Sequence, residues 1–135
     1  MSTHPQRRRR VLVIEDDPLI SRLIARGLKQ RHDVSLAMDG EEALERFGRG
    51  ERYDLIFCDL QMPRMTGVDL LLNLDHIAPD QVELIVFLTA DPDHPMARLI
   101  SGNEIINKAT SVSFVEIAER WLRKRYPEME DPSGG

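Results

Sequence analysis

The sequence predicts an α/β domain built on a doubly wound parallel sheet of five strands. Short apolar runs alternate along the chain with segments whose apolar residues recur every three or four positions. The apolar runs are also uninterrupted, which is typical of strands that are buried on both faces. Such alternation favours parallel strands that are joined by right-handed helical crossovers.

Each expected element carries a local signal. Val11–Ile14 is β-branched and aliphatic, and Pro18 suits the first turn of the next helix because no N–H is needed there. Further strands are short apolar runs, expected at 33–38, 53–58, 82–88 and 104–107. Helices with one apolar face are expected at 19–29, 41–47, 67–77, 93–101 and 111–126. The fourth helix is short, and we expect Asp93 to cap it and Gly102 to end it.

Composition indicates one ordinary globular domain of 135 residues. We expect the folded part to cover residues 10–126, between an N-terminal tail at 1–9 that contains the arginine run and a C-terminal tail at 127–135. The net charge of −5 disfavours direct nucleic-acid binding, and no stretch is long enough to span a membrane. Cys58 is the only cysteine, which fits a cytoplasmic location.

Five polar residues follow the predicted strands at the point where each strand ends. Because the carboxyl ends of parallel strands meet at one edge of a sheet, these residues should converge there. Clustered carboxylates suit Mg²⁺, an aspartate can attack phosphorus, and lysine and threonine can contact phosphoryl oxygens. The five residues are Glu15, Asp16, Asp59, Thr89 and Lys108.

Four segments in order, VLVIEDDP, YDLIFCDLQMPRMTG, FLTA and INK, resemble the response-regulator receiver domains of two-component signalling. The resemblance covers about residues 10–125 and implies a flavodoxin-like (βα)5 fold with strand order 2-1-3-4-5. It implies that Asp59 is the phosphoacceptor and that Thr89 and Lys108 assist it. The resemblance also implies a Mg²⁺ ion held by Asp16, Asp59 and the backbone carbonyl of Gln61, with Glu15 acting through water.

The same resemblance implies the partners and the mode of action. The phosphoryl donor would be a sensor histidine kinase or a histidine phosphotransfer protein, and phosphorylation would switch protein–protein interactions. The domain would lose the phosphoryl group slowly by itself, and would not be a turnover enzyme on an external substrate. A homodimer or an effector could use the last two predicted helices, where Trp121 lies on one of two apolar stripes.

Three departures from the family pattern affect the output side. Ala109 stands where the family usually has a proline in a cis peptide, so the Lys108–Ala109 bond is either strained cis or trans with a rearranged loop. Ile105 replaces the usual aromatic residue, and the segment between Thr89 and Lys108 is short. These departures keep open a second interpretation, a pseudo-receiver that binds partners without phosphorylation.

Two further interpretations concern an alternative enzyme class and the histidines. A Mg²⁺-dependent phosphohydrolase is disfavoured, because Gln61 stands where such enzymes typically carry a second aspartate. The four histidines lack metal-ligand spacing, and each is predicted to lie at the surface. They are His4, His32, His76 and His94.

Overall fold

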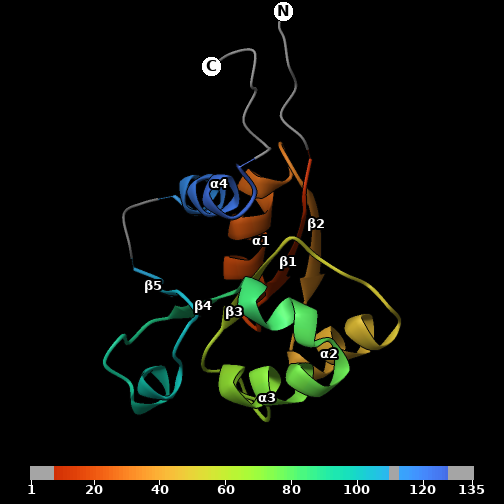
Figure 1. Cartoon of the computed structure of the whole chain (residues 1–135). Coiled ribbons are helices and arrows are strands. Elements are labelled where there is room, and N and C mark those ends of the chain that lie inside the picture. The colour runs from red at the N-terminus through yellow and green to blue at the C-terminus, as the bar shows by residue number, and fades with distance from the viewer. Residues whose placement is uncertain (1–7, 110–112, 128–135) are drawn as a thin grey trace, which may run out of the picture.

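The computed structural model describes residues 8–109 and 113–127. Five parallel strands form one sheet in the order β2-β1-β3-β4-β5, so the predicted fold class and strand order are confirmed (Figure 1). The strands are β1 (Arg10–Ile14), β2 (Asp33–Ala37), β3 (Leu55–Asp59), β4 (Ile85–Thr89) and β5 (Ile105–Asn107).

The central strands are buried on both faces, as their uninterrupted apolar runs predicted. Successive side chains of a strand point to opposite faces of the sheet. In β1, Val11 and Val13 belong to one core cluster, whereas Leu12 and Ile14 belong to the other, and all four side chains are fully buried. The sheet therefore needs helices on both sides.

Helices cover both faces of the sheet (Figure 1). α1 and α4 pack together on one face, and α2 and α3 lie against each other on the other face. Their bounds are α1 (Pro18–Leu28), α2 (Gly40–Gly48), α3 (Gly67–Ile77) and α4 (Phe114–Arg125). Among the described residues, no helix is both long enough and apolar enough to cross a bilayer.

The largest differences from the predicted strand boundaries are the starts of β3 and β4. β3 begins at Leu55 instead of Tyr53, and β4 begins at Ile85 instead of Val82. Residues Pro79–Leu84 form a 3₁₀ helix, η1, whose Gln81 side chain bonds both backbone groups of Tyr53. The N–H of Tyr53 donates to Gln81 Oε1 at 2.7 Å, and Gln81 Nε2 donates to the Tyr53 carbonyl at 3.2 Å. These two hydrogen bonds hold η1 against the residue that lies two positions before β3.

The predicted fourth helix at 93–101 is only a short 3₁₀ helix, η2 (Pro95–Leu99). His94, not Asp93, caps it, because His94 Nδ1 accepts a hydrogen bond from the N–H of Met96 at 3.1 Å. η2 ends at Leu99 with Ile100 as its C-terminal cap, so Gly102, whose φ of 90° lies in the left-handed region that glycine favours, does not end the helix as predicted. The helix between β4 and β5 is thus shorter than the predicted helix at 93–101.

The prediction that His32 lies at the surface is wrong. Its side chain is only 1% exposed, and its Nε2 lies 2.7 Å from Glu119 Oε1 on α4. Its Nδ1 accepts a hydrogen bond from the backbone N–H of Arg9 at 3.1 Å. Arg8 and Arg9, which the sequence placed in the N-terminal tail, therefore pack against the folded domain. His76 is exposed as predicted, and His4 lies outside the described residues.

The last helix buries both of its apolar stripes. Ile117 and Leu122 are buried, and the half-buried Trp121 packs against both core clusters. α4 begins at Phe114 after the cap residue Ser113, whereas the predicted start at 111 lies outside the described residues. The two stripes are therefore explained by a wide buried face.

Candidate functional site

The predicted acids meet at the carboxyl edge of the sheet. Glu15 and Asp16 directly follow β1, and Asp59 is the last residue of the neighbouring strand β3. Each of the three offers a carboxylate oxygen, and these oxygens all lie within 4.8 Å of one another. Glu15 is fully buried and Asp59 is 4% exposed, so these two acids lie below the surface, whereas Asp16 is partly exposed.

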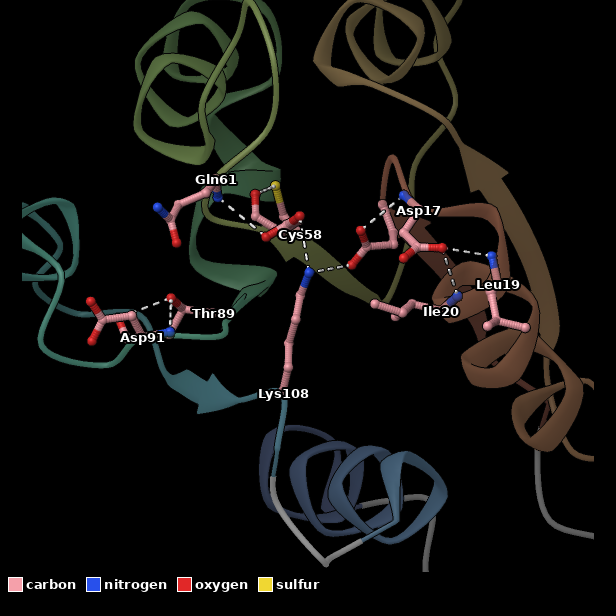
Figure 2. A network of polar contacts seen from close by, with 10 residues as sticks. Asp17, Leu19, Ile20, Cys58, Gln61, Thr89, Asp91 and Lys108 are labelled. Carbon is pink, nitrogen blue, oxygen red and sulfur yellow. Dashed lines mark hydrogen bonds and ion pairs between the residues drawn. The ribbon is translucent and has the colours of Figure 1, made fainter.

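Lys108 joins the two buried acids. It follows β5, and in Figure 2 its side chain extends from the end of that strand toward the acid cluster. Its Nζ lies 2.8 Å from Glu15 Oε1 and 3.0 Å from Asp59 Oδ2. The sequence prediction that strands one, three and five bring these side chains together is therefore seen directly in the geometry.

Backbone groups hold the two carboxylates in place. The N–H of Asp17 donates to Glu15 Oε2 at 3.1 Å, and the N–H of Gln61 donates to Asp59 Oδ1 at 3.2 Å. Asp17 itself caps α1, because its Oδ1 accepts from the N–H of Leu19 at 2.9 Å. Asp17 therefore stabilises the start of α1.

Burial raises the pKa of the two buried acids, Glu15 and Asp59. It raises the pKa of Glu15 from 4.5 to about 7, although the hydrogen bond from Lys108 opposes this shift. Burial likewise raises the pKa of Asp59, again against the effect of Lys108. Burial lowers the pKa of Lys108, but its hydrogen bonds with Glu15 and Asp59 outweigh that effect and leave the pKa raised. The lysine therefore carries a positive charge between two closely spaced acids.

This shift predicts a pH dependence of stability in the metal-free protein. A carboxyl whose folded pKa is raised binds more protons in the native state, so stability falls as pH rises from 4.5 to about 7. Glu15→Gln, which removes this titration, should flatten that fall. Urea unfolding with a chelator at several pH values across this window measures it. Parallel wild-type and variant profiles would contradict the prediction.

Thr89 lies at the same edge, but its hydroxyl is bonded elsewhere. Its Oγ1 donates to the carbonyl of Asp91 at 3.0 Å and accepts from the N–H of Asp91 at 3.1 Å. Figure 2 shows Thr89 and Asp91 side by side, away from the Lys108 ammonium. The sequence analysis placed Thr89 at this edge but did not foresee its turn, although threonine hydroxyls commonly bond the backbone two residues later.

The loop after Lys108 has a trans arrangement. No peptide bond in the described part of the chain is cis, so the bond between Lys108 and Ala109 is trans. Asn107 Oδ1 accepts a hydrogen bond from the N–H of Ala109 at 2.9 Å. The sequence analysis did not predict this turn, although an asparagine side chain commonly accepts a hydrogen bond from the N–H two residues later.

Comparison with known proteins identifies the family to which the chain belongs. The model of the response regulator receiver domain matches residues 11–111, which is most of the chain. The chain belongs to the response regulator receiver domain family. It is thus a receiver domain of two-component signalling, and the match spans the strands that carry Glu15, Asp16, Asp59, Thr89 and Lys108.

Relatives and solved structures agree with this assignment. The 3',5'-cyclic-nucleotide phosphodiesterase regA of Dictyostelium discoideum is 31% identical over 122 residues, covering 86% of the chain but only 14% of regA. The Francisella response regulator 1452 receiver domain is 29% identical with a TM-score of 0.68, covering 87% of the chain and 98% of that structure. The receiver domain of sensor histidine kinase PA1611 from Pseudomonas aeruginosa PAO1, solved with a coordinated magnesium ion, is 23% identical, with a TM-score of 0.73 and coverage of 87% and 97%. The similarity to the PA1611 receiver domain shows only that the fold is shared.

The donor set of this receiver domain fits a hard divalent cation. Glu15, Asp16 and Asp59 supply only carboxylate oxygens, which are the ligands that Mg²⁺ prefers. Few protein ligands are available, which suits an ion that keeps several of its own waters. Asp16 is partly exposed, so a cation could reach the cluster from solvent.

Proposed function

We propose that this receiver domain accepts a phosphoryl group on Asp59 from a phosphohistidine. The observation that supports the proposal most is the position of Asp59, which lies at the carboxyl edge within 3.0 Å of Lys108 and beside Glu15 and Asp16. A buried aspartate with a raised pKa and a fixed cation beside it is a suitable nucleophile toward phosphorus.

The transfer exchanges one bond to phosphorus for another. A carboxylate oxygen of Asp59 attacks the phosphorus, the phosphorus–nitrogen bond breaks, and the histidine of the donor leaves with that electron pair. The product is an acyl phosphate on Asp59. Lys108 neutralises charge on the phosphoryl oxygens, and its two present partners, Glu15 and Asp59, show that its ammonium reaches the reacting carboxylate.

We also propose that Mg²⁺ is held by Asp16, Asp59 and the backbone carbonyl of Gln61, with Glu15 assisting through water. When bound, the ion would neutralise acid repulsion and phosphoryl charge. Asp59 would then be relieved of the repulsion from its neighbours. The ion would also leave Lys108 free to turn from the carboxylates toward the incoming phosphoryl group.

Thr89 completes the proposed site after a local change. Its hydroxyl is bound to the backbone of Asp91, so those hydrogen bonds must break before it can donate to a phosphoryl oxygen. The arrival of the phosphoryl group would thus pull Thr89 away from the loop that follows β4. This loop is the point where phosphorylation would first be sensed.

The donor partner is proposed to be a sensor histidine kinase or a histidine phosphotransfer protein, acting in the cytoplasm. A homodimer or an effector could use η2 and α4. The pseudo-receiver alternative is not favoured, because the acid cluster and Lys108 are complete and in contact. A turnover phosphohydrolase is not proposed either, because Gln61 replaces the expected second acid.

Intact-mass measurement with acetyl phosphate and Mg²⁺ tests the proposed function. Wild-type protein should gain the mass of one phosphoryl group and lose it slowly after the donor is removed. Protein that gains no phosphoryl group from acetyl phosphate or from a phosphorylated histidine phosphotransfer protein would contradict the proposal. A pseudo-receiver would give this negative result while still binding its partner.

Mg²⁺ should stabilise the wild-type fold, because the ion relieves repulsion among buried carboxylates in the native state alone. A concentration of roughly ten times its Kd should add about 1.4 kcal/mol to the free energy of unfolding and raise Tm by roughly 5 °C. Asp16→Ala should remove most of this shift, whereas Asp75→Ala, on the exposed side of α3, should keep it. Thermal melts with Mg²⁺ or a chelator measure the effect, and equal shifts in wild type and Asp16→Ala would refute it.

Phosphorylation should change the loops at the sheet edge more than the middle of β5. Ile105 has no aromatic ring that could swing between packed positions. The free energy of its packing should therefore differ little between the unphosphorylated and the phosphorylated domain. Backbone amide shifts with and without a beryllofluoride phosphoryl mimic should be largest at 90–93 and at Lys108 and Ala109. Changes centred on Ile105, with quiet loops at Asp91 and Ala109, are the opposite result.

A further inference from the structure

The backbone after β5 is held by a side chain where other receiver domains are expected to use a proline. Ala109 keeps an N–H group, and that group donates to Oδ1 of Asn107 at 2.9 Å. The hydrogen bond spans Lys108 and closes an asparagine turn around it. Because the N–H is a donor, the atom that faces it must be the amide oxygen of Asn107, which fixes the orientation of the side chain.

We propose that Asn107 is the positioning residue for Lys108. Its turn sets the backbone direction at Lys108, so that the ammonium group reaches Glu15 and Asp59. This inference rests on the proposed function in one respect only, namely that Lys108 assists phosphoryl transfer to Asp59. The turn and its effect on the position of Lys108 can be tested without phosphorylation.

Two hydrogen bonds restrain the backbone on the two sides of Lys108. The register pairs Asn107 with Thr89, and Lys108 is the next residue, just beyond the end of β5. The N–H of Lys108 donates to the carbonyl of Thr89 at 2.8 Å, which fixes the side that leads into the strand. The hydrogen bond between Asn107 and Ala109 fixes the side that leads out of it.

The length of the lysine side chain makes this restraint consequential. Its ammonium group sits on a flexible four-carbon stem with substantial rotamer entropy. A small rotation of the backbone at Lys108 therefore displaces Nζ by much more than it displaces Cα. Two ion pairs, at 2.8 Å to Glu15 and 3.0 Å to Asp59, depend on where that stem begins.

The chemistry of the turn explains why asparagine and alanine occur together here. Proline at position 109 would fix φ but could not donate the hydrogen bond that Asn107 accepts. Alanine leaves φ free and supplies the donor, so the restraint must come from a side chain. Asparagine and aspartate both offer an oxygen at the same distance from the backbone, whereas alanine at position 107 offers none.

The rate of phosphorylation by acetyl phosphate with Mg²⁺ tests the role of Asn107 in transfer. Asn107→Ala should slow it roughly fivefold, about the effect of one lost hydrogen bond. Asn107→Asp, which keeps the acceptor oxygen, should stay close to the wild-type rate. Asn73→Ala is the matched control, because Asn73 is an exposed asparagine on α3 whose side chain donates to the backbone carbonyl of Asp69 at 2.8 Å. Its rate should be unchanged.

A double-mutant cycle separates positioning from a general structural role. If Asn107 acts through Lys108, Asn107→Ala should have no further effect on the residual rate in a Lys108→Ala background. An equal loss in both backgrounds would overturn the inference. Wild-type rates in Asn107→Ala, or equally slow rates in Asn107→Ala and Asn107→Asp, would also overturn it.

NMR of the unphosphorylated protein decides the inference independently of phosphoryl transfer. In Asn107→Ala, the amide of Ala109 should exchange faster with solvent, and the side-chain carboxyl ¹³C signals of Glu15 and Asp59 should move. Asn107→Asp should restore both signals toward the wild-type values. Unchanged carboxyl signals in Asn107→Ala would overturn the positioning role, whereas a wild-type protein that takes no phosphoryl group would contradict only the proposed function.

Discussion

Asp59→Asn should abolish phosphorylation of this receiver domain. The change preserves the shape of the side chain but removes the nucleophilic carboxylate, and no other acid of the cluster is held between Lys108 and the N–H of Gln61. The variant should still fold, because burial raises the pKa of Asp59 and thus already disfavours its charged form. Intact-mass spectrometry after incubation with acetyl phosphate and Mg²⁺ measures the result.

The matched control is Asp75→Asn, which makes the same chemical change at an exposed position on α3. It should gain a phosphoryl group at the wild-type rate. Phosphorylation of Asp59→Asn at the wild-type rate would show that the acceptor is a different residue. Peptide mapping of the phosphorylated wild-type protein would then identify that residue.

The positions of the polar residues at the edge of the sheet could be predicted from the sequence, because each position depends only on the strand that precedes it. Each polar residue follows an uninterrupted apolar run, and parallel topology brings the ends of such runs together. Glu15, Asp59 and Lys108 accordingly meet within hydrogen-bonding distance. The metal and phosphoryl roles came from chemistry and family resemblance, and they stay predictions until they are measured.

Some of the features that the sequence did not predict depend on side chains that bond to backbone far away in the sequence. Gln81 binds the backbone of Tyr53 just before β3, and residues 82–84 belong to η1 and not to β4. Periodicity reports which face a residue occupies, but it does not report such a partner. The hydrogen bonds of Thr89 with Asp91 are local and could have been found from the turn pattern alone.

His32 is the clearest failure of single-residue reasoning. An isolated histidine between Arg31 and Asp33 looks like a surface residue, because its neighbours in sequence are charged. Its partner Glu119 lies on α4, in a segment that sequence spacing alone does not connect to it. Burial of this pair joins three segments, namely the N-terminal arginines, the turn before β2, and α4.

The largest stability effect should therefore come from His32→Ala. His32 Nδ1 accepts from the N–H of Arg9, so Nε2 carries the proton and donates to Glu119 Oε1 at 2.7 Å. Glu119 is 5% exposed, and its Oε2 has no hydrogen-bond partner within the described residues. Removing His32 takes away the hydrogen-bond donor of a buried carboxylate, which should cost about 2 to 3 kcal/mol in the free energy of unfolding.

Urea unfolding of three variants separates the buried pair from its environment. His76→Ala removes an exposed histidine on α3 and should change the free energy of unfolding by less than about 0.5 kcal/mol. Replacing both partners, as in His32→Leu with Glu119→Leu, should recover much of the loss, because no buried charge then lacks a partner. A His32→Ala variant within about 1 kcal/mol of wild type would contradict the argument, since the carboxylate would then have found water or another donor at little cost.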